Sequence, residues 1–237
     1  NFTAYFVAYL YKILNFFIPS ITIEYTDIIY PIVSTIIMSI FLFLLVRRFF
    51  DWRVGILSVL LLNLIPSFLF RTLGGSSDHD ALGMMFFIMA MYFYVVAWQT
   101  EKIRYSITFA ILSAIITVFG YLTAGLTTFL FFIIGTFLLI ELILEKFEKK
   151  DYYILLSWFG TILIILTFIL KKVTISTWVY SLTTFPVIFV IIASSLYLAI
   201  CHKNFLHIKD KINFPTGLFS ISITILLLIL SGFIFLG

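Results

Sequence analysis

A polar loop at residues 71–80 carries the side chains of this sequence that are best suited to chemistry. Asp78 and Asp80 are two positions apart, so a helix would turn their carboxylates about 200° from one another, whereas a turn lets both face one ion. Gly74 and Gly75 permit such a turn. Paired carboxylates with few other ligands suit Mg²⁺ or Mn²⁺, hard cations that keep several waters and bind phosphate oxygens. The loop therefore predicts Asp78 and Asp80 as ligands of a divalent cation.

The neighbours of this acidic pair admit two explanations. Arg71 could bind a carboxylate or a phosphate bidentately, or it could extend to the lipid head groups. One of residues 76–78 would equally make a good N-cap for a helix that begins near Ala81. His79 could add a metal ligand, although the middle residue of such a motif usually points to solvent. An Asp-x-Asp motif alone does not decide between a site and a helix cap.

The composition of the chain places the loop in a membrane protein. Of 237 residues 63% are hydrophobic and 11% charged, with mean hydropathy +1.19, whereas soluble domains average about 45–50% apolar and about 25% charged residues. A bilayer core needs roughly 20 apolar residues per helix. Residues 30–237 thus predict an all-α, multi-pass bundle of about eight transmembrane helices, at 30–47, 54–70, 81–98, 103–120, 125–144, 153–170, 175–200 and 216–236.

Single residues refine this prediction. Pro66 and Pro186 are expected inside helices, which bilayers tolerate better than water does. Cys201 is alone, which excludes a disulfide framework within the chain. No phosphate-binding glycine loop, nucleophile triad or nucleic-acid motif is present, so we expect no nucleic-acid partner.

Polar side chains within the helices are expected to form hydrogen bonds between helices; they are Ser58, Asn63, Ser194 and Ser195.

The basic residues predict the orientation of the bundle. Eleven of them fall in alternate loops, and four fall on the opposite side. The side richer in Lys and Arg is normally cytoplasmic, so the loop at 71–80 should lie on the extracytoplasmic side of the cell membrane. The richer set is Arg47, Arg48, Arg53, Lys102, Arg104, Lys146, Lys149, Lys150, Lys203, Lys209 and Lys211, and the poorer set is Lys12, Arg71, Lys171 and Lys172.

The first 29 residues are predicted to be the end of an extracytoplasmic loop. Residues 2–18 are apolar but short, and they contain Lys12. An interfacial helix is the favoured interpretation, and a ninth spanning helix with Lys12 extended to the head groups is the alternative. Because the chain starts without Met and stops at the edge of a helix, we expect it to be a fragment.

Residues 71–82, Arg-Thr-Leu-Gly-Gly-Ser-Ser-Asp-His-Asp-Ala-Leu, resemble the second acidic motif of the oligosaccharyltransferase catalytic subunit, in its archaeal and bacterial single-subunit form. Residues 9–12 with the acidic stretch 24–27 resemble the end of that family's long first outer loop. Residues 47–55 resemble its first cytoplasmic loop, and 120–125 occupy the place of an aromatic-rich outer turn, without the Trp often found there. The likeness runs in register along the chain, and only the loop at 71–80 is specific.

The resemblance implies a GT-C-like membrane glycosyltransferase. Such an enzyme moves a glycan from a dolichyl or polyprenyl (pyro)phosphate carrier to the Asn amide of an Asn-x-Ser/Thr sequon in an acceptor polypeptide. By position, Asp78 and Asp80 would be ligands of Mn²⁺ or Mg²⁺, which neutralises the leaving phosphate. Arg71 would support that cluster or contact the carrier phosphate. Catalytic roles would therefore fall to Arg71, Asp78 and Asp80.

Several parts of the family's site have no counterpart in these 237 residues. The first acidic residue would precede Asn1. The Glu that grips the acceptor amide would follow Gly237, as would the soluble domain with the Trp-Trp-Asp-Tyr-Gly motif. We therefore expect half of a metal site, inactive alone.

Two other functions remain open at this point. Another polyprenyl-phosphate-dependent glycosyltransferase, such as a protein mannosyltransferase, would usually carry its acidic pair on the first outer loop, whereas here the pair follows an earlier hairpin. A transporter would place ionisable residues near the middle of the membrane, whereas the charges here gather in the loops.

Overall fold

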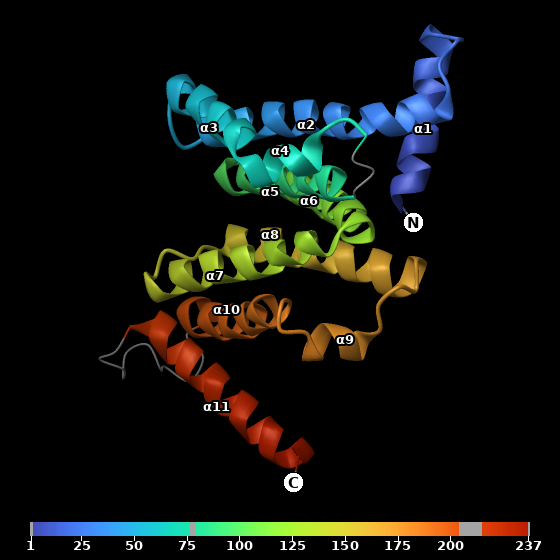
Figure 1. Cartoon of the computed structure of the whole chain (residues 1–237). Helices are drawn as coiled ribbons and strands as arrows, with labels where there is room; N and C mark the ends of the chain where they lie inside the picture. Colours follow the sequence, from blue (N-terminus) through green and yellow to red (C-terminus); the bar gives the residue numbers. More distant parts are fainter. Residues whose placement is uncertain (1, 76–78, 204–214, 237) are drawn as a thin grey trace. The chain divides into compact units, whose positions relative to one another are not determined.

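A computed structural model describes residues 2–75, 79–203 and 215–236 of the chain (Figure 1). These residues form helices and connecting turns, and no strand occurs among them. The helices group into two compact units, Asn1–Thr128 and Phe129–Gly237. The predicted all-α class is therefore confirmed.

The first unit is built around a pair of long helices, α5 and α6, that pack against each other, with α2 against α5. Small side chains line the contact, among them Ala90 and Ala114, which are fully buried and allow the helices to approach closely. The Ser113 hydroxyl of α6 donates to the Ala90 carbonyl of α5 at 2.8 Å. The unit comprises α1 (Phe2–Phe17), α2 (Ile23–Arg47), α3 (Trp52–Leu64), α4 (Pro66–Thr72), α5 (Asp80–Gln99), α6 (Ile103–Thr123) and the 3₁₀ turn η1 (Gly125–Thr128).

The second unit packs α10 against α7, α8 and α11. An aromatic cluster forms its core, because the ring of Phe131 lies 5.3 Å from that of Trp158 and 5.8 Å from that of Trp178, centroid to centroid. The Tyr152 and Ser195 hydroxyls are 3.0 Å apart and join α8 to α10. The elements are α7 (Phe129–Ile143), α8 (Lys149–Leu163), the π-helical turn η2 (Ile164–Ile169), α9 (Ile175–Tyr180), α10 (Phe185–Lys203) and α11 (Thr216–Leu236).

The membrane spans largely follow the expected segments. In the described residues five helices are long and apolar enough to cross a bilayer: Ile23–Arg47, Asp80–Gln99, Ile103–Thr123, Gly125–Ile143 and Lys149–Ile169. A sixth span results if α3 and α4, which meet at an angle of 76°, are counted together. The apolar stretches Phe185–Cys201 and Thr216–Ile229 are shorter. The segment expected at 175–200 is not one helix, because α9 ends at Tyr180 and α10 begins at Phe185.

Two prolines begin helices where the sequence predicted them inside helices. Pro66 is the first residue of α4, and Pro186 is the second residue of α10. Proline has no N–H and a fixed φ, so the first turn of a helix accommodates it without losing a hydrogen bond. The prediction of helix-interior prolines at these two positions is wrong, and both mark breaks in expected spans.

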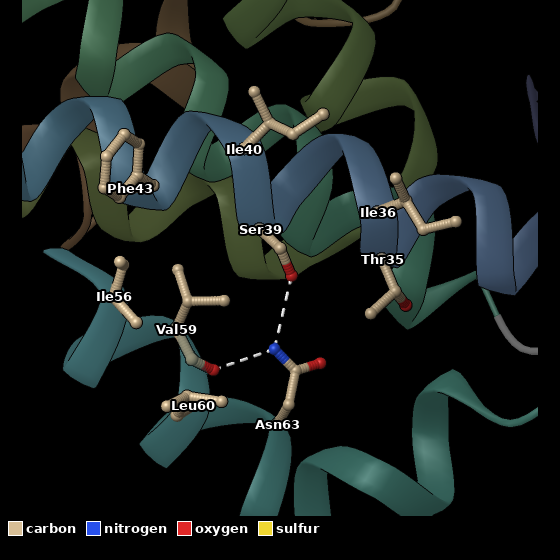
Figure 2. A pocket seen from close by; sticks show the side chains of 9 residues that line it. All are labelled: Thr35, Ile36, Ser39, Ile40, Phe43, Ile56, Val59, Leu60 and Asn63. Atoms are coloured by element: carbon tan, nitrogen blue, oxygen red, sulfur yellow. Dashed lines mark hydrogen bonds between the residues drawn. The ribbon is translucent and has the colours of Figure 1, made fainter.

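The polar groups within the helices pair only partly as predicted. Asn63 bonds across to Ser39 of α2 (Figure 2), and Ser195 pairs with Tyr152, as expected. The prediction is wrong for Ser58, which donates to Val54 of its own helix at 2.9 Å. It is also wrong for Ser194, which donates to Ile191 at 3.2 Å.

The predicted N-terminal helix is present as α1. Its first residue packs on the core of the unit, since the Phe2 ring lies 5.3 Å from the ring of Phe119 and 6.0 Å from that of Phe86. Its last turn is open, with Phe16 82% and Phe17 74% exposed. That α1 lies in the membrane interface stays a prediction.

Candidate functional site

Arg71 owes its position to a break in the second helical hairpin. Asp51 caps the start of α3 by accepting a bond from the Val54 N–H at 3.0 Å. The helix ends at Leu64, and Pro66 starts α4 at 76° to it. Arg71 then falls in the last turn of α4, where a cation complements the helix carbonyls.

Asp80 faces Arg71 from the start of the next helix. It is the first residue of α5, where a carboxylate complements the positive end of the helix dipole. Arg71 Nη1 donates to Asp80 Oδ2 in an ion pair. The side chain of Asp80 is 20% exposed and that of Arg71 64% exposed. His79 Nε2 lies 3.9 Å from Asp80 Oδ1. The loop thus brings together the first and last residues of the predicted motif.

Two glycines fasten the loop to α2. Gly75 has φ +85°, in the region that glycine adopts without strain, and its N–H donates to the Ile28 carbonyl at 3.1 Å. A Cβ on Gly74 would lie 3.3 Å from the same carbonyl oxygen. Ile28 is nineteen residues from Arg47, or about 28 Å along the helix axis. The loop is therefore attached to α2 about one hydrocarbon-core thickness, roughly 30 Å, along the helix from Arg47.

The second acidic residue of the motif, Asp78, lies outside the described residues together with Ser76 and Ser77. Its distance from Asp80 stays a prediction. The cap explanation is wrong in position, because α5 begins at Asp80 and its N-cap residue is His79, whose side chain makes no capping bond.

A pocket of about 400 Å³ opens beside the ion pair. Arg71 and Asp80 form its charged wall, and side chains of α3, α4, α5 and η1 form the rest. Apart from Ser67 and Thr72 the remaining lining is apolar: Leu62, Ile65, Phe68, Ala81, Met84 and Leu126. The pocket can therefore hold a ligand with an anionic head and a hydrocarbon tail.

Close packing behind the pocket fixes the start of α5. Gly83 is one turn after Asp80, and a Cβ there would come within 2.5 Å of the Ala124 Cβ. A Cβ on Gly120 would meet the Thr127 side chain at 2.7 Å. The turn at 120–125, noted in the sequence, thus holds α5 in place and brings Leu126 to the pocket. The sequence analysis did not single out Gly83 or Leu126. The available signals were the small size of Gly83 and, for Leu126, its place directly after the turn at 120–125.

The described residues do not by themselves complete a metal site. No group of three or more His, Cys, Asp and Glu side chains that could hold an ion occurs in the ranges that the structure describes. Asp80 is the one carboxylate of the pocket lining, and Arg71 already neutralises it. A divalent cation would therefore need Asp78 as well.

Residues 2–169 match the family model for dolichyl-phosphate-mannose-protein mannosyltransferases. The match covers all the described residues of the first unit, with Arg71, Asp80 and the pocket. The chain belongs to this family. It is therefore a GT-C membrane glycosyltransferase, with a lipid-linked sugar donor and a protein acceptor implied by the family. The predicted fold class is confirmed, and the predicted oligosaccharyltransferase is confirmed at the level of a polyprenyl-phosphate-dependent glycosyltransferase. No curated protein matches the chain.

Proposed function

We propose that the pocket between α4 and α5 binds the phosphate of a polyprenyl-linked glycan and that the chain transfers this glycan to a protein. The observation that carries the proposal is the Arg71–Asp80 pair at the wall of an otherwise apolar pocket. A prenyl phosphate has the same division, with an anion at one end and hydrocarbon beyond it. The family match supports a donor of this class.

Arg71 has the chemistry to bind the phosphate. A guanidinium carries five N–H donors in a planar fork, and Asp80 accepts a bond from Nη1. The remaining donors can form paired bonds to phosphate oxygens, which Lys cannot reproduce. Asp80 orients the guanidinium, and it also lowers the electrostatic cost of a cation at the membrane boundary. Asp80 is thus proposed as a positioning residue for Arg71.

The apolar wall suits the carrier chain next to the phosphate. Leu62 and Ile65 belong to the end of α3 and to the bend, while Met84 lies one turn into α5. Their side chains would cover the first isoprene units. A volume of about 400 Å³ is within the usual range of ligand pockets, about 300–1,000 Å³.

A metal ion is part of the proposal and would involve Asp78 and Asp80. Mn²⁺ or Mg²⁺ held there would neutralise charge on the leaving phosphate. Asp80 would then be shared between the ion and Arg71. The proposed location is the cell membrane with this loop on the extracytoplasmic side, supported by the distribution of basic residues, eleven against four.

The acceptor distinguishes two forms of the proposed function. The likeness of residues 71–82 to the oligosaccharyltransferase motif favours the Asn of an Asn-x-Ser/Thr sequon, and an oligosaccharide as the moving group. The family match favours mannosyl transfer to protein. The first form is the one that we propose, because residues 71–82 follow the motif of that enzyme in residue type and order; the Arg71–Asp80 pair suits the donor phosphate of either form.

Peptide acceptors test this choice. Membranes containing the full-length protein are given lipid-linked glycans and one of two peptides, Asn-x-Thr or its Gln-x-Thr counterpart, and products are read by mass spectrometry. We expect glycan on the Asn peptide alone. Mannose on both peptides would replace the first form by the second. Modification of neither peptide by any polyprenyl-linked donor would contradict both forms.

A further inference from the structure

Two lysines, Lys171 and Lys172, lie in the loop between η2 and α9. Both residues are exposed, and within the described ranges neither forms an ion pair. The sequence offers no carboxylate nearby, because no Asp or Glu occurs between Asp151 and Asp210. The pair is therefore a local concentration of positive charge that this part of the chain does not neutralise.

The loop follows directly on a candidate membrane span. α8 and η2 together form the span Lys149–Ile169, of 21 residues, which extends about 30 Å, the thickness of the hydrocarbon core. With Lys149 and Lys150 at one boundary of such a span, Lys171 and Lys172 fall at the level of the opposite head groups. That side carries four basic residues against eleven, so the general bias of charge does not account for the pair.

The backbone holds the two lysines and α9 in one folded surface. Lys171 has φ +50°, and the Lys172 N–H donates to the Leu166 carbonyl at 2.9 Å. Beyond this turn Trp178 fixes α9 to the unit, because its indole N–H donates to the Thr167 hydroxyl at 2.9 Å and the residue is buried. The lysines therefore keep a defined position relative to the start of α9.

The outer side of α9 and of the turn after it is apolar. Ile175 and Val179 are 58% and 54% exposed, and Tyr180 and Leu182 are each 85% exposed. Contact with water is unfavourable for such a surface, whereas lipid chains cover it. Because α9 leads from the lysines back toward α10 (Figure 1), the surface has cations at one end and apolar side chains beyond them.

We propose that Lys171, Lys172 and the exposed side of α9 bind an anionic phospholipid of the bilayer. The phosphate lies between the two ammonium groups, and a hydrocarbon chain covers Ile175 and Val179. Ammonium groups attract phosphates as point charges, so the phosphate of a prenyl carrier has the same chemistry. Phospholipid is the occupant because an open surface meets it in large excess over the carrier. The proposal is independent of the proposed function.

Quenching by brominated lipids tests the proposal on the full-length protein. In a cysteine-free background that includes Cys201→Ser, Ile175→Cys carries a fluorescent label three residues after Lys172. Vesicles of phosphatidylcholine contain in addition either phosphatidylglycerol or phosphatidylcholine with brominated chains, which quench the label on contact. Each lysine near an anionic surface contributes about fivefold, so we expect the anionic lipid to be preferred about 25-fold at low salt. Equal quenching by the two lipids would overturn the proposal.

Neutral variants of the pair locate the preference. Lys171→Asn with Lys172→Gln should abolish it, and Asn suits the φ of +50° at position 171. Lys149→Gln with Lys150→Gln is the matched control, because it removes the same charge at the start of α8 and should leave the preference unchanged. A preference that survives the first double change, or that the control reduces equally, would overturn the assignment to these lysines.

Salt and the prenyl carrier complete the test. At 1 M salt the Debye length falls to about 3 Å, so the preference for the anionic lipid should decrease, and an unchanged preference would contradict a site based on charge. A prenyl phosphate without bromine, added as a minor component of the vesicles, should leave the quenching by brominated phosphatidylglycerol in place. Full relief of quenching would assign the surface to the carrier and overturn phospholipid as the occupant.

Discussion

Replacing Arg71 by Ala should separate its role in binding from its role in folding. The Arg71 side chain is 64% exposed, and exposed ion pairs contribute about 0–1 kcal/mol to stability. The thermal midpoint of the variant should therefore stay close to that of the wild type. A hydrogen bond from a charged donor contributes about 1.5–3 kcal/mol. Loss of one bond to the phosphate should thus lower kcat/KM for the lipid-linked donor by about 10- to 150-fold.

The assay titrates the donor against purified full-length protein and follows the glycosylated peptide by mass spectrometry. Arg71→Lys should fall between wild type and Arg71→Ala, because it keeps the charge and loses the planar fork. Asp80→Asn should also lower kcat/KM, because it removes both the partner that orients Arg71 and one proposed ligand of the ion. Arg104→Ala is the control, since Arg104 is an exposed arginine in the first turn of α6. A value for Arg71→Ala within about twofold of wild type, well short of the loss of one charged bond, would refute phosphate binding by Arg71.

Three other predictions concern the loop and its support. Gly83→Leu should lower stability by about 1–3 kcal/mol, measured by thermal unfolding, because its Cβ would lie 2.5 Å from that of Ala124; an unchanged midpoint would contradict that contact. Gly75→Val should reduce transfer more than Gly75→Asn, since Asn tolerates the φ of +85°; equal activity of the two variants would refute a requirement for the turn. Chelation should abolish transfer, Mn²⁺ should restore it, and Asp78→Asn or Asp80→Asn should raise the Mn²⁺ concentration needed; activity that survives chelation would exclude the ion.

The sequence predicted the helices and the polar loop because both depend on local properties. Apolar runs of span length and a cluster of Gly, Asp and Arg are visible without knowing any neighbour. The sequence left the partner of Arg71 open between a carboxylate, a phosphate and the lipid head groups, and the structure shows an ion pair with Asp80.

The breaks in two expected spans could not be predicted from hydropathy. In the segment expected at 175–200, Thr184 donates to the Trp178 carbonyl at 2.5 Å and the Ser181 and Thr183 hydroxyls are 2.8 Å apart. Such local bonds compete with the helix, yet Ser and Thr scarcely lower the mean hydropathy of an apolar run. The break thus depends on side-chain hydrogen bonds that a hydropathy profile does not represent.

The packing behind the site depends on residues far apart in sequence. Gly83 and Ala124 are separated by 41 positions, and neither is unusual in a membrane helix. The two residues meet because the start of α5 lies against the end of α6, and no pattern within either helix reveals this contact. Leu126 lines the pocket for the same reason, because η1 directly follows the end of α6.

The bend at Ile65 and Pro66 has a consequence for the solvent of the pocket. Across the bend the Ile65 N–H donates to the Leu62 carbonyl at 3.2 Å, and the Phe68 and Leu69 N–H groups donate to the Ile65 carbonyl at 3.1 and 2.9 Å. The other carbonyls in the last turn of α3 lack intrahelical donors. Hydrocarbon cannot satisfy them, so such a break persists where water or protein reaches it. Leu62 and Ile65 line the pocket, and we expect a short column of water to hydrate the backbone there. If the donor binds as proposed, this water would compete with the peptide as a nucleophile, and slow release of free glycan in the absence of peptide is the expected result.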